Sequence, residues 1–348
     1  MLLKNQENKL SDRIRDALPG VTPGVSLRAY HAGHLVHDIR VGETWHTYDL
    51  ASLTKVVFTQ QAMMQAFDRG QWNLGTTVAE LLPDFPNQSV VIRELLTHSS
   101  GITWWKPFYL SLDPALPWQA KRVWLYEELK KSEFNKTGKS VYSDLGFMLL
   151  GFVLEKLHGK NLLEVWADIE SGVYADTSLG FHVENKTAAA LEMFAPTEDC
   201  PWRKRVVRGQ VHDENAFSLG GISTHAGLFG SIADLSAFGL NLRSQLLGTA
   251  GPQVRKETAQ LFASRAIPTE AGDWALGFML PSPEGATCGS HFSPCSIGHT
   301  GFTGTSFWYD ARQDLLVLIL SNRVYYGRDN KAFLQLRPKI HDWVCESL

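Results

Sequence analysis

The apolar residues of this chain follow the period of a β-strand near both ends and the period of a helix between them. Early strand-like runs cover 25–30 and 34–40, and the turn pair Ala32-Gly33 between them predicts a hairpin. Three later runs are also strand-like: 274–279, 304–309 and 315–321. Helical periodicity covers much of the rest, and the predicted helices are 5–18, 50–68, 90–98, 120–131, 145–157, 162–170, 232–247, 252–264 and 330–345.

This order of elements predicts an α/β fold of the α+β type. Strands from both chain termini would form one antiparallel sheet that is flanked by helices, and the helices of the middle would form an inserted lobe. We therefore expect a sheet lobe made of residues 1–55 plus 225–348 and a helical lobe made of residues 56–224.

Composition and charge exclude several classes of function. The chain has 348 residues, of which 44% are hydrophobic, so it can fold around a sizeable core. Its 33 basic and 36 acidic residues give a net charge of -3, which argues against nucleic acid as a partner. The longest apolar run, 147–154, is too short to cross a bilayer, so no membrane partner is expected.

The cysteines and the first residues bear on location. Cys200, Cys288, Cys295 and Cys345 show no C-x-x-C spacing, which indicates reduced thiols and neither a disulfide framework nor a zinc site. Charged residues are spread through positions 4–15 without the apolar block of a secretory signal. We expect a cytoplasmic protein, although a secreted form whose leader has been removed would look the same.

The most informative chemical motif is Ser52-Leu53-Thr54-Lys55, at the start of a predicted helix. Residues three apart on a helix project from the same face, so the Lys55 amine could lie within hydrogen-bond reach of the Ser52 hydroxyl. A helix that begins just before Ser52 would also direct unpaired N–H groups and the positive end of its dipole at the hydroxyl. On its own, this spacing is equally typical of a helix start with a solvated lysine.

Two segments far away in the sequence favour a catalytic role for this motif. Tyr142-Ser143-Asp144 precedes a second apolar helix pattern, and His299-Thr300-Gly301 precedes the strand-like run 304–309. In this order the three motifs resemble those of the serine β-lactamase and penicillin-binding-protein superfamily: S-x-x-K, then Y-x-N or S-x-N, then K-T-G or H-T-G.

Two further phrases, 94–101 and 220–229, are similar to the class C branch of that superfamily. This branch holds class C β-lactamases, D-amino-acid peptidases and β-lactamase-like esterases. The resemblance covers roughly residues 20–345. It implies the sheet-and-helix fold described above, with the active site in the cleft between the lobes and with no metal or other cofactor.

The resemblance also implies roles for the motif residues. Ser52 would be the nucleophile that forms an acyl-enzyme, and Lys55 or Tyr142 would take its proton. A desolvated Lys55 could be neutral and act as the base, or a Tyr142 beside a cationic Lys55 could have a lowered pKa and act instead. The backbone N–H groups of Ser52 and Phe302 would form the oxyanion hole, and the Gly301-Phe302 peptide would border the substrate. The alternative for Tyr142 is an aromatic residue packed in the core.

Two positions depart from the family pattern. Asp144 stands where the family usually has asparagine, and its carboxylate would favour the ammonium form of Lys55, which shifts the base role to Tyr142. The alternative is that Asp144 only caps the following helix. His299 replaces the lysine of K-T-G, so with Thr300 and Gly301 it would offer a substrate carboxylate only a weak, conditional positive charge. We therefore expect carboxylated β-lactams to bind poorly.

Other polar and aromatic residues could border the site. The segment 211–216 carries His212, Asp213, Glu214 and Asn215; its adjacent side chains cannot all face one metal ion, and we predict a site-bordering loop ordered by local hydrogen bonds. His98 and His225 are expected to be structural. A basic run could attract an anion or be a solvated loop; it consists of Arg203, Lys204, Arg205 and Arg208. An aromatic cluster could wall the cleft or pack in the core; it consists of Trp104, Trp105, Phe108, Tyr109 and Trp118.

The sequence thus predicts a serine hydrolase that acts through an acyl-enzyme on a small-molecule or short-peptide substrate. That substrate would be a small ester, or an amide such as a D-amino-acid peptide. One alternative is a β-lactamase or a penicillin-binding DD-carboxypeptidase, against which His299 and Asp144 argue. Another is a non-catalytic binding protein on the same fold, against which the intact Ser52, Lys55 and Tyr142 argue.

Overall fold

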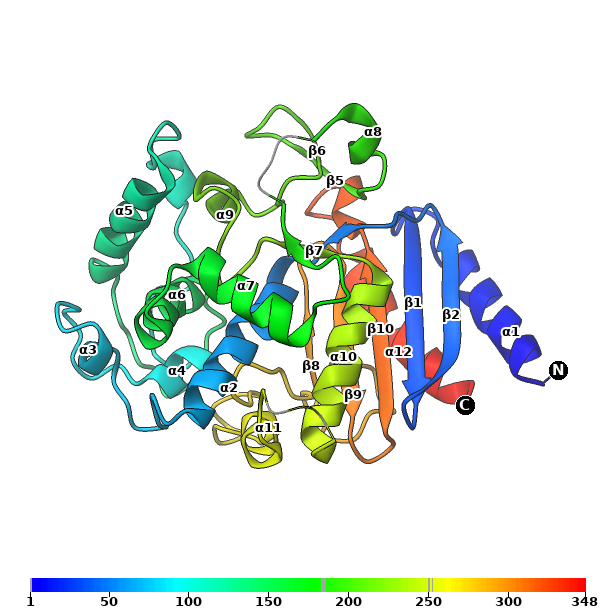
Figure 1. Ribbon diagram of the computed structural model, residues 1–348. Coiled ribbons are helices and arrows are strands. Elements are labelled where there is room, and N and C mark those ends of the chain that lie inside the picture. Colours follow the sequence, from blue (N-terminus) through cyan, green and yellow to red (C-terminus); the bar gives the residue numbers. More distant parts are fainter. Residues whose placement is uncertain (1, 183–185, 250, 252) are drawn as a thin grey trace.

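The computed structural model describes residues 2–182, 186–249, 251 and 253–348 (Figure 1). Its main feature is a five-stranded antiparallel sheet with the strand order β2-β1-β10-β9-β8. Strands β1 and β10 pair along their whole length, from Val25 opposite Ser321 to His31 opposite Leu315. Both ends of the chain therefore meet in one sheet, as the sequence predicts. The strands are β1 Gly24–His31, β2 His34–Gly42, β8 Ile297–Thr300, β9 Ser306–Asp310 and β10 Leu315–Ser321.

The sheet has a hydrophobic core on each face, because β10 is buried on both sides. Alternate residues of a strand point to opposite faces. Leu316, Leu318 and Leu320 face the core that includes α10 Ile232–Leu247. The intervening residues Leu315, Val317 and Ile319 face the core that includes α1 Leu2–Asp16 and α12 Ala332–Glu346. Figure 1 shows these helices covering the two faces.

The helical part of the chain is arranged around α6 Asp144–His158, which is buried along most of its length. A helix that is apolar on nearly all sides belongs in a core, and α6 contacts α2, α3, α4, α5 and α7. Ser143 caps its first turn and Gly159, in the left-handed conformation, ends it. The other helices of this part are α2 Gln61–Asp68, α3 Val78–Leu81, α4 Ile92–Leu96, α5 Trp118–Lys130, α7 Leu162–Val173, α8 Ala188–Leu191 and α9 Glu214–Ser218.

The short strands β4 Gly180–Phe181, β5 Pro196–Cys200 and β6 Arg205–Arg208 occur inside the range 56–224 that the sequence assigns to a helical lobe. Strand β4 joins β7 Leu228–Gly230 and β3 Tyr48–Asp49, which lie outside that range, in a small sheet, and β5 pairs with β6. Strands of two to five residues carry too little alternation to be recognised from the sequence.

Several predicted elements need correction. The strand predicted at 274–279 is instead a tight turn with isolated bridges, because Gly277 has a φ of +88° and the Ala275 N–H donates to the Phe278 carbonyl. The helix predicted at 252–264 is α11 Lys256–Ala263; position 252 lies outside the described residues. The helix predicted at 90–98 is only the short α4. In the described ranges, no helix combines the length and the apolar character that a membrane span requires.

Candidate active site

Ser52 lies on a strained turn, where the sequence predicts the start of a regular helix over 50–68. The turn Ala51–Leu53 is 3₁₀, Lys55–Gln60 is a π-helical stretch, and α-helical geometry begins only at Gln61. Ala51 has a φ of +48°, a left-handed conformation that costs a non-glycine residue about 1–2 kcal/mol. The Asp49 carboxylate holds this turn by accepting the Ala51 N–H at 2.8 Å. Strain of this kind is concentrated at functional sites.

Lys55 is fully buried directly below Ser52. Its ammonium donates hydrogen bonds to Ser52 Oγ at 3.3 Å, to Asp144 Oδ1 at 2.7 Å and to the His225 carbonyl oxygen at 3.0 Å. Burial alone would lower the pKa of Lys55, but the nearby Asp144 and Tyr142 raise it above its ordinary value. Lys55 is therefore cationic at neutral pH.

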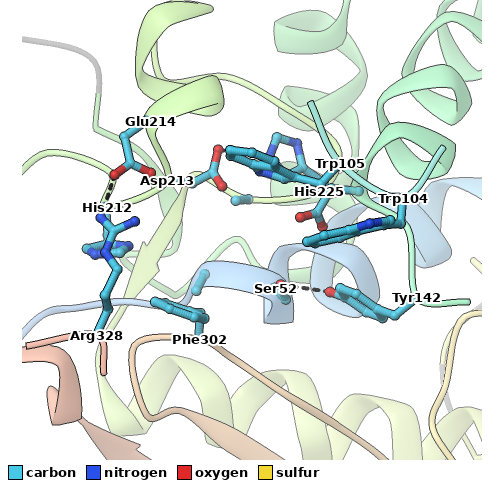
Figure 2. Close-up of a pocket in the computed structure, with 13 residues that line it drawn as sticks. Ser52, Trp104, Trp105, Tyr142, His212, Asp213, Glu214, His225, Phe302 and Arg328 are labelled. Carbon is cyan, nitrogen blue, oxygen red and sulfur yellow. Dashed lines mark hydrogen bonds and ion pairs between the residues drawn. The ribbon is translucent and has the colours of Figure 1, made fainter. Parts of the chain in front are cut away.

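Tyr142 approaches Ser52 from the other side. Its hydroxyl donates to Ser52 Oγ at 2.8 Å (Figure 2). Its ring lies 4.5 Å from the His98 ring and 4.9 Å from the Lys55 ammonium, a cation–π distance.

The pKa of Tyr142 is raised above its ordinary value. Burial raises the pKa, the Lys55 cation lowers it, and Asp144 raises it again. The lowered tyrosine pKa that the sequence suggests is therefore wrong for the resting site. The reason is that burial, with a further contribution from the Asp144 charge, raises the Tyr142 pKa by more than the Lys55 cation lowers it.

Asp144 is an ion-pair partner of Lys55 and is not the cap of α6. The cap is Ser143, whose Oγ accepts the Gly146 N–H at 3.1 Å. Asp144 is the first helical residue, and its carboxylate points down to the buried ammonium. Of the two interpretations that the sequence left open, the structure favours the electrostatic one.

His299 lies on β8 and is 1% exposed. Burial, together with the Lys55 cation, lowers its pKa to about 3, so it is neutral at physiological pH. Its Nδ1 is hydrogen-bonded to the Thr300 carbonyl oxygen at 3.0 Å, and its ring faces Tyr142 and Trp274. The conditional positive charge that the sequence predicts for His299 is therefore wrong. The burial that keeps the ring neutral could not be seen in the sequence.

The turn after β8 is fastened to the backbone that presents Ser52. Thr303 Oγ1 donates to the Asp49 carbonyl at 2.8 Å, and Thr305 Oγ1 donates to the Leu50 carbonyl at 3.1 Å. These contacts bring Phe302 beside Ser52 in one pocket. Within the described part of the chain, neither the Ser52 N–H nor the Phe302 N–H donates to another residue, so both are free for a ligand oxygen.

Gly301 is required by the close approach of these two segments. A Cβ there would collide with Thr305 Oγ1 and would lie 2.7 Å from the Leu50 carbonyl oxygen. We expect Gly301→Ala to displace the turn and to lower kcat about 100-fold, because small misplacements of an oxyanion donor are costly. Steady-state kinetics on an activated ester would measure it. Gly172→Ala, in open space on α7, is the control, and equal kcat values for the two variants would contradict the prediction.

The pocket above Ser52 has a volume of about 420 Å³. Trp104 and Phe302 expose 58% and 46% of their surface, so the walls beside Ser52 are largely aromatic. The further lining residues are Ala51, Trp105, Tyr142, Asp144, His212, Asp213, Glu214, His225, Ala226 and Arg328. Figure 2 shows Arg328, His212 and Glu214 at the end of the pocket beyond Phe302, with Tyr142 and Trp104 at the opposite end.

Sequence reasoning missed Arg328 and Glu198. Arg328 makes a bidentate ion pair with Glu198 and a second ion pair with Glu214, and Glu198 also contacts His212 Nε2 at 2.8 Å. The His212 ring stacks on Phe302 with a centroid distance of 5.5 Å. These residues are far apart in the chain and follow no motif, so only the fold reveals that they order the pocket wall.

Some of the remaining candidate residues line the pocket, and others support the segments that do. The segment 212–214 lines the pocket, as predicted, and Asp213 caps α9 while its Oδ1 contacts His225 Nε2 at 3.0 Å. Arg203 does not face the pocket; it donates to the Val211 and His212 carbonyls and holds this loop from behind. His98 is a buried scaffold residue whose Nδ1 accepts the Ser143 N–H at 3.0 Å.

The other members of the two ambiguous sets also lie outside the pocket. Arg208 pairs with Glu192, and Phe108, Tyr109 and Trp118 do not line the cavity. Among the described residues, no group of three or more histidine, cysteine or acidic side chains is placed to hold a metal ion.

Comparisons with known proteins give a family match over most of the chain. The sequence model of the beta-lactamase family matches residues 11–337. A protein of Escherichia coli K12 described as a "Putative D-alanyl-D-alanine carboxypeptidase" is 30% identical over 314 residues, which cover 79% of this chain and 69% of that protein. The N-acetylmuramyl-L-alanine amidase of Bacillus subtilis strain 168 is 30% identical over 334 residues, covering 85% and 72%.

Solved structures share the fold at lower identity. EstCE1, described as a hydrolase with promiscuous acyltransferase activity, superimposes with a TM-score of 0.72 at 18% identity and covers 97% of this chain and 98% of its own. The octameric penicillin-binding protein homologue from Pyrococcus abyssi gives a TM-score of 0.67 at 20% identity, covering 94% and 76%. At these identities the similarity concerns the fold alone.

Proposed function

This chain belongs to the beta-lactamase family and is a serine hydrolase that acts through an acyl-enzyme, and we propose that Ser52 is its nucleophile. The observation that carries the proposal is the convergence of two donors on one oxygen. Ser52 Oγ accepts hydrogen bonds from the Lys55 ammonium and from the Tyr142 hydroxyl, at the floor of a pocket large enough for a small ligand.

We assign to Tyr142 the transfer of the Ser52 proton, with the tyrosine remaining a neutral phenol before and after the transfer. Its raised pKa makes a phenolate rare, so Tyr142 would accept the Ser52 proton while it passes its own proton to the leaving group. Lys55 stays cationic and stabilises the negative charge that develops on both oxygens. The same relay, run from water, would release the acyl group from Ser52.

The pocket favours substrates that carry no carboxylate beside the reacting carbonyl. Because His299 is neutral and buried, it offers no positive charge at the position where K-T-G relatives have lysine. Trp104 and Phe302 offer apolar surface in the pocket above Ser52. We propose small esters with apolar acyl groups as the first substrate class.

We expect kcat/KM for p-nitrophenyl acetate to exceed that for benzylpenicillin at least about 10-fold, and this ratio to stay constant between about pH 8 and about pH 5.5. The pH independence follows because His299, with a pKa of about 3, does not gain a proton in that range. Initial rates at each pH would measure it. A higher kcat/KM for the penicillin, or a penicillin rate that rises relative to the ester rate as the pH falls, would contradict the proposal.

An amide substrate is the second candidate, and the names of the relatives favour it. The Escherichia coli and Bacillus subtilis proteins are named a D-alanyl-D-alanine carboxypeptidase and an N-acetylmuramyl-L-alanine amidase. Intact-mass analysis after incubation with a fluorophosphonate and, separately, with penicillin separates the two candidates. An adduct with only the first supports an esterase-like site, and adducts with both support a site that recognises acyl-D-amino-acid substrates.

A further inference from the structure

Two buried arginines lie behind the turn that carries Phe302. Arg323, which follows β10, and Arg337, in α12, are each 3% exposed. The Arg323 backbone lies against Gly304, and its guanidinium lies 4.7 Å over the Phe302 ring. Arg337 Nη1 points at the Thr305 carbonyl oxygen at 3.5 Å. The two guanidiniums therefore contact the same turn, 302–305, that we assign to the oxyanion hole.

Neither guanidinium has a carboxylate partner within the described ranges. Arg323 donates one hydrogen bond, to the Asn330 carbonyl, and Arg337 makes only its long contact to Thr305. The Nε atoms of both are buried without any partner. The nearby Glu198 is engaged by Arg328 and His212. In contrast, the other buried cations, Lys55 and Arg122, each pair with an acidic side chain.

A buried charge without a partner is costly, and natural proteins neutralise it with a counterion or a bound ion. The charge of Arg337 also acts on His341 and His299, whose Nδ1 and Nε2 atoms, respectively, are buried and bond to no described residue. Burial and the charge of Arg323 lower the pKa of Arg337 to about 10, which still leaves it cationic at neutral pH. Two cationic guanidiniums are thus buried against one turn, and Glu198, whose charge reaches Arg323, is already paired with Arg328 and His212.

We propose that Arg323 and Arg337 bind a small inorganic anion of halide size behind the turn 302–305. The two arginines do not line the pocket of Ser52, so a substrate carboxylate in that pocket does not reach them. The bound anion would offset one of the two positive charges, would accept hydrogen bonds from both guanidiniums, and would fix the turn that carries the Phe302 N–H. This site does not depend on which substrate the enzyme hydrolyses.

The test is thermal unfolding of the full chain at increasing concentrations of sodium bromide. Sodium gluconate keeps the ionic strength constant at about 200 mM, and its anion is too large for an enclosed site. We expect a saturable rise in Tm of about 2–4 °C as bromide replaces gluconate, because a ligand that binds only the folded state stabilises it. Arg337→Gln should abolish the saturable part of this rise. Arg312→Gln, at an exposed position, should retain it and controls for general salt effects.

Anomalous diffraction from crystals of the wild-type protein grown in bromide gives a readout that does not require the variant to fold. A bromide peak between Arg323 and Arg337 supports the site. A wild-type Tm with no saturable response to bromide, the same response in Arg337→Gln, or bromide-grown crystals without a peak at this position would each overturn it.

Discussion

Replacing Ser52 with alanine should lower kcat by at least about 10⁴-fold on every substrate. Without the serine nucleophile, the groups that activate it can no longer contribute to catalysis. Lys55 and Tyr142 both direct their donors at Ser52 Oγ, and neither has another reacting atom within the site. The free energy of unfolding should change by about 1 kcal/mol or less, since the Ser52 side chain is half-buried and contributes only these contacts. Turnover and chemical denaturation of the same preparation would give both values.

A covalent readout separates loss of the nucleophile from loss of the fold. The wild-type protein should gain one fluorophosphonate adduct by intact mass, and the Ser52→Ala variant should gain none. Ser111→Ala, at an exposed position on the helical side, is the matched control and should be labelled like the wild type. A label that maps to another residue, or turnover by the Ser52→Ala variant, would remove Ser52 from the role we assign to it.

The fold was predictable to the extent that its signals are local or repeat along an element. The hairpin around Ala32-Gly33 and the strand β10, which is apolar up to Leu320, were predicted from the sequence, and the structure shows that β10 contributes to a core on each face. The helix predicted at 232–247 is confirmed as α10, and Ser231 caps its first turn. The turn at 274–279 could not be predicted, because its apolar residues have the alternation of a strand and only the position of Gly277 decides otherwise.

In the site, the sequence predicted which residues come together better than it predicted their charge states. Ser52 and Lys55 are linked by a hydrogen bond as their spacing suggested, Tyr142 contacts Ser52 as the family resemblance implied, and Asp144 takes the first of the two roles left open for it. The neutral state of His299 depends on burial among Trp274, Tyr142 and the Lys55 cation, and these neighbours come from separate elements. A pKa is a property of the assembled surroundings, so a residue type alone does not fix it.

The strained start of the Ser52 helix and the wall around Arg328 were also beyond sequence reasoning. An alanine is normally favourable in a helix, so nothing marks Ala51 as left-handed until Asp49 and the Thr303–Thr305 contacts are seen to hold it. Arg328 belongs to no motif, and its two ion-pair partners, Glu198 and Glu214, lie in other segments. Such long-range ion pairs are set by the fold.

The second large effect is expected from Asp144→Asn, which should lower kcat/KM about 10- to 100-fold and move the alkaline limb of the pH-rate profile to lower pH. In the wild-type protein Asp144 helps to raise the pKa of the buried Lys55 above its ordinary value, so Lys55 stays cationic across the usual assay range. Removing that anion leaves the lowering effect of burial, and the Lys55 pKa should fall into this range. The cation that stabilises the Ser52 and Tyr142 oxygens would then be lost as the pH rises.

The Asp144→Asn variant should also be less stable than the wild-type protein. Asparagine retains an acceptor for Lys55 but not the charge, so we expect the free energy of unfolding at neutral pH to fall by about 2 kcal/mol, less than the roughly 3–5 kcal/mol for removing one partner of a buried ion pair outright. Because the native pKa of Lys55 is raised, the contribution of the wild-type pair is fully present below the unfolded lysine pKa and is lost only as the pH rises through the native one. Urea denaturation of both proteins at neutral pH would measure the difference.

The matched control is Ser143→Ala, one residue earlier. Ser143 is the cap of α6, so its loss should cost about 1 kcal/mol of stability while the apparent pKa values of kcat/KM stay at their wild-type positions. The two variants therefore separate helix capping from electrostatics at adjacent positions. If the pH-rate profile of Asp144→Asn differs from the wild type only in height, with identical apparent pKa values, then Asp144 does not set the charge of Lys55 and the relay through Tyr142 loses its physical basis.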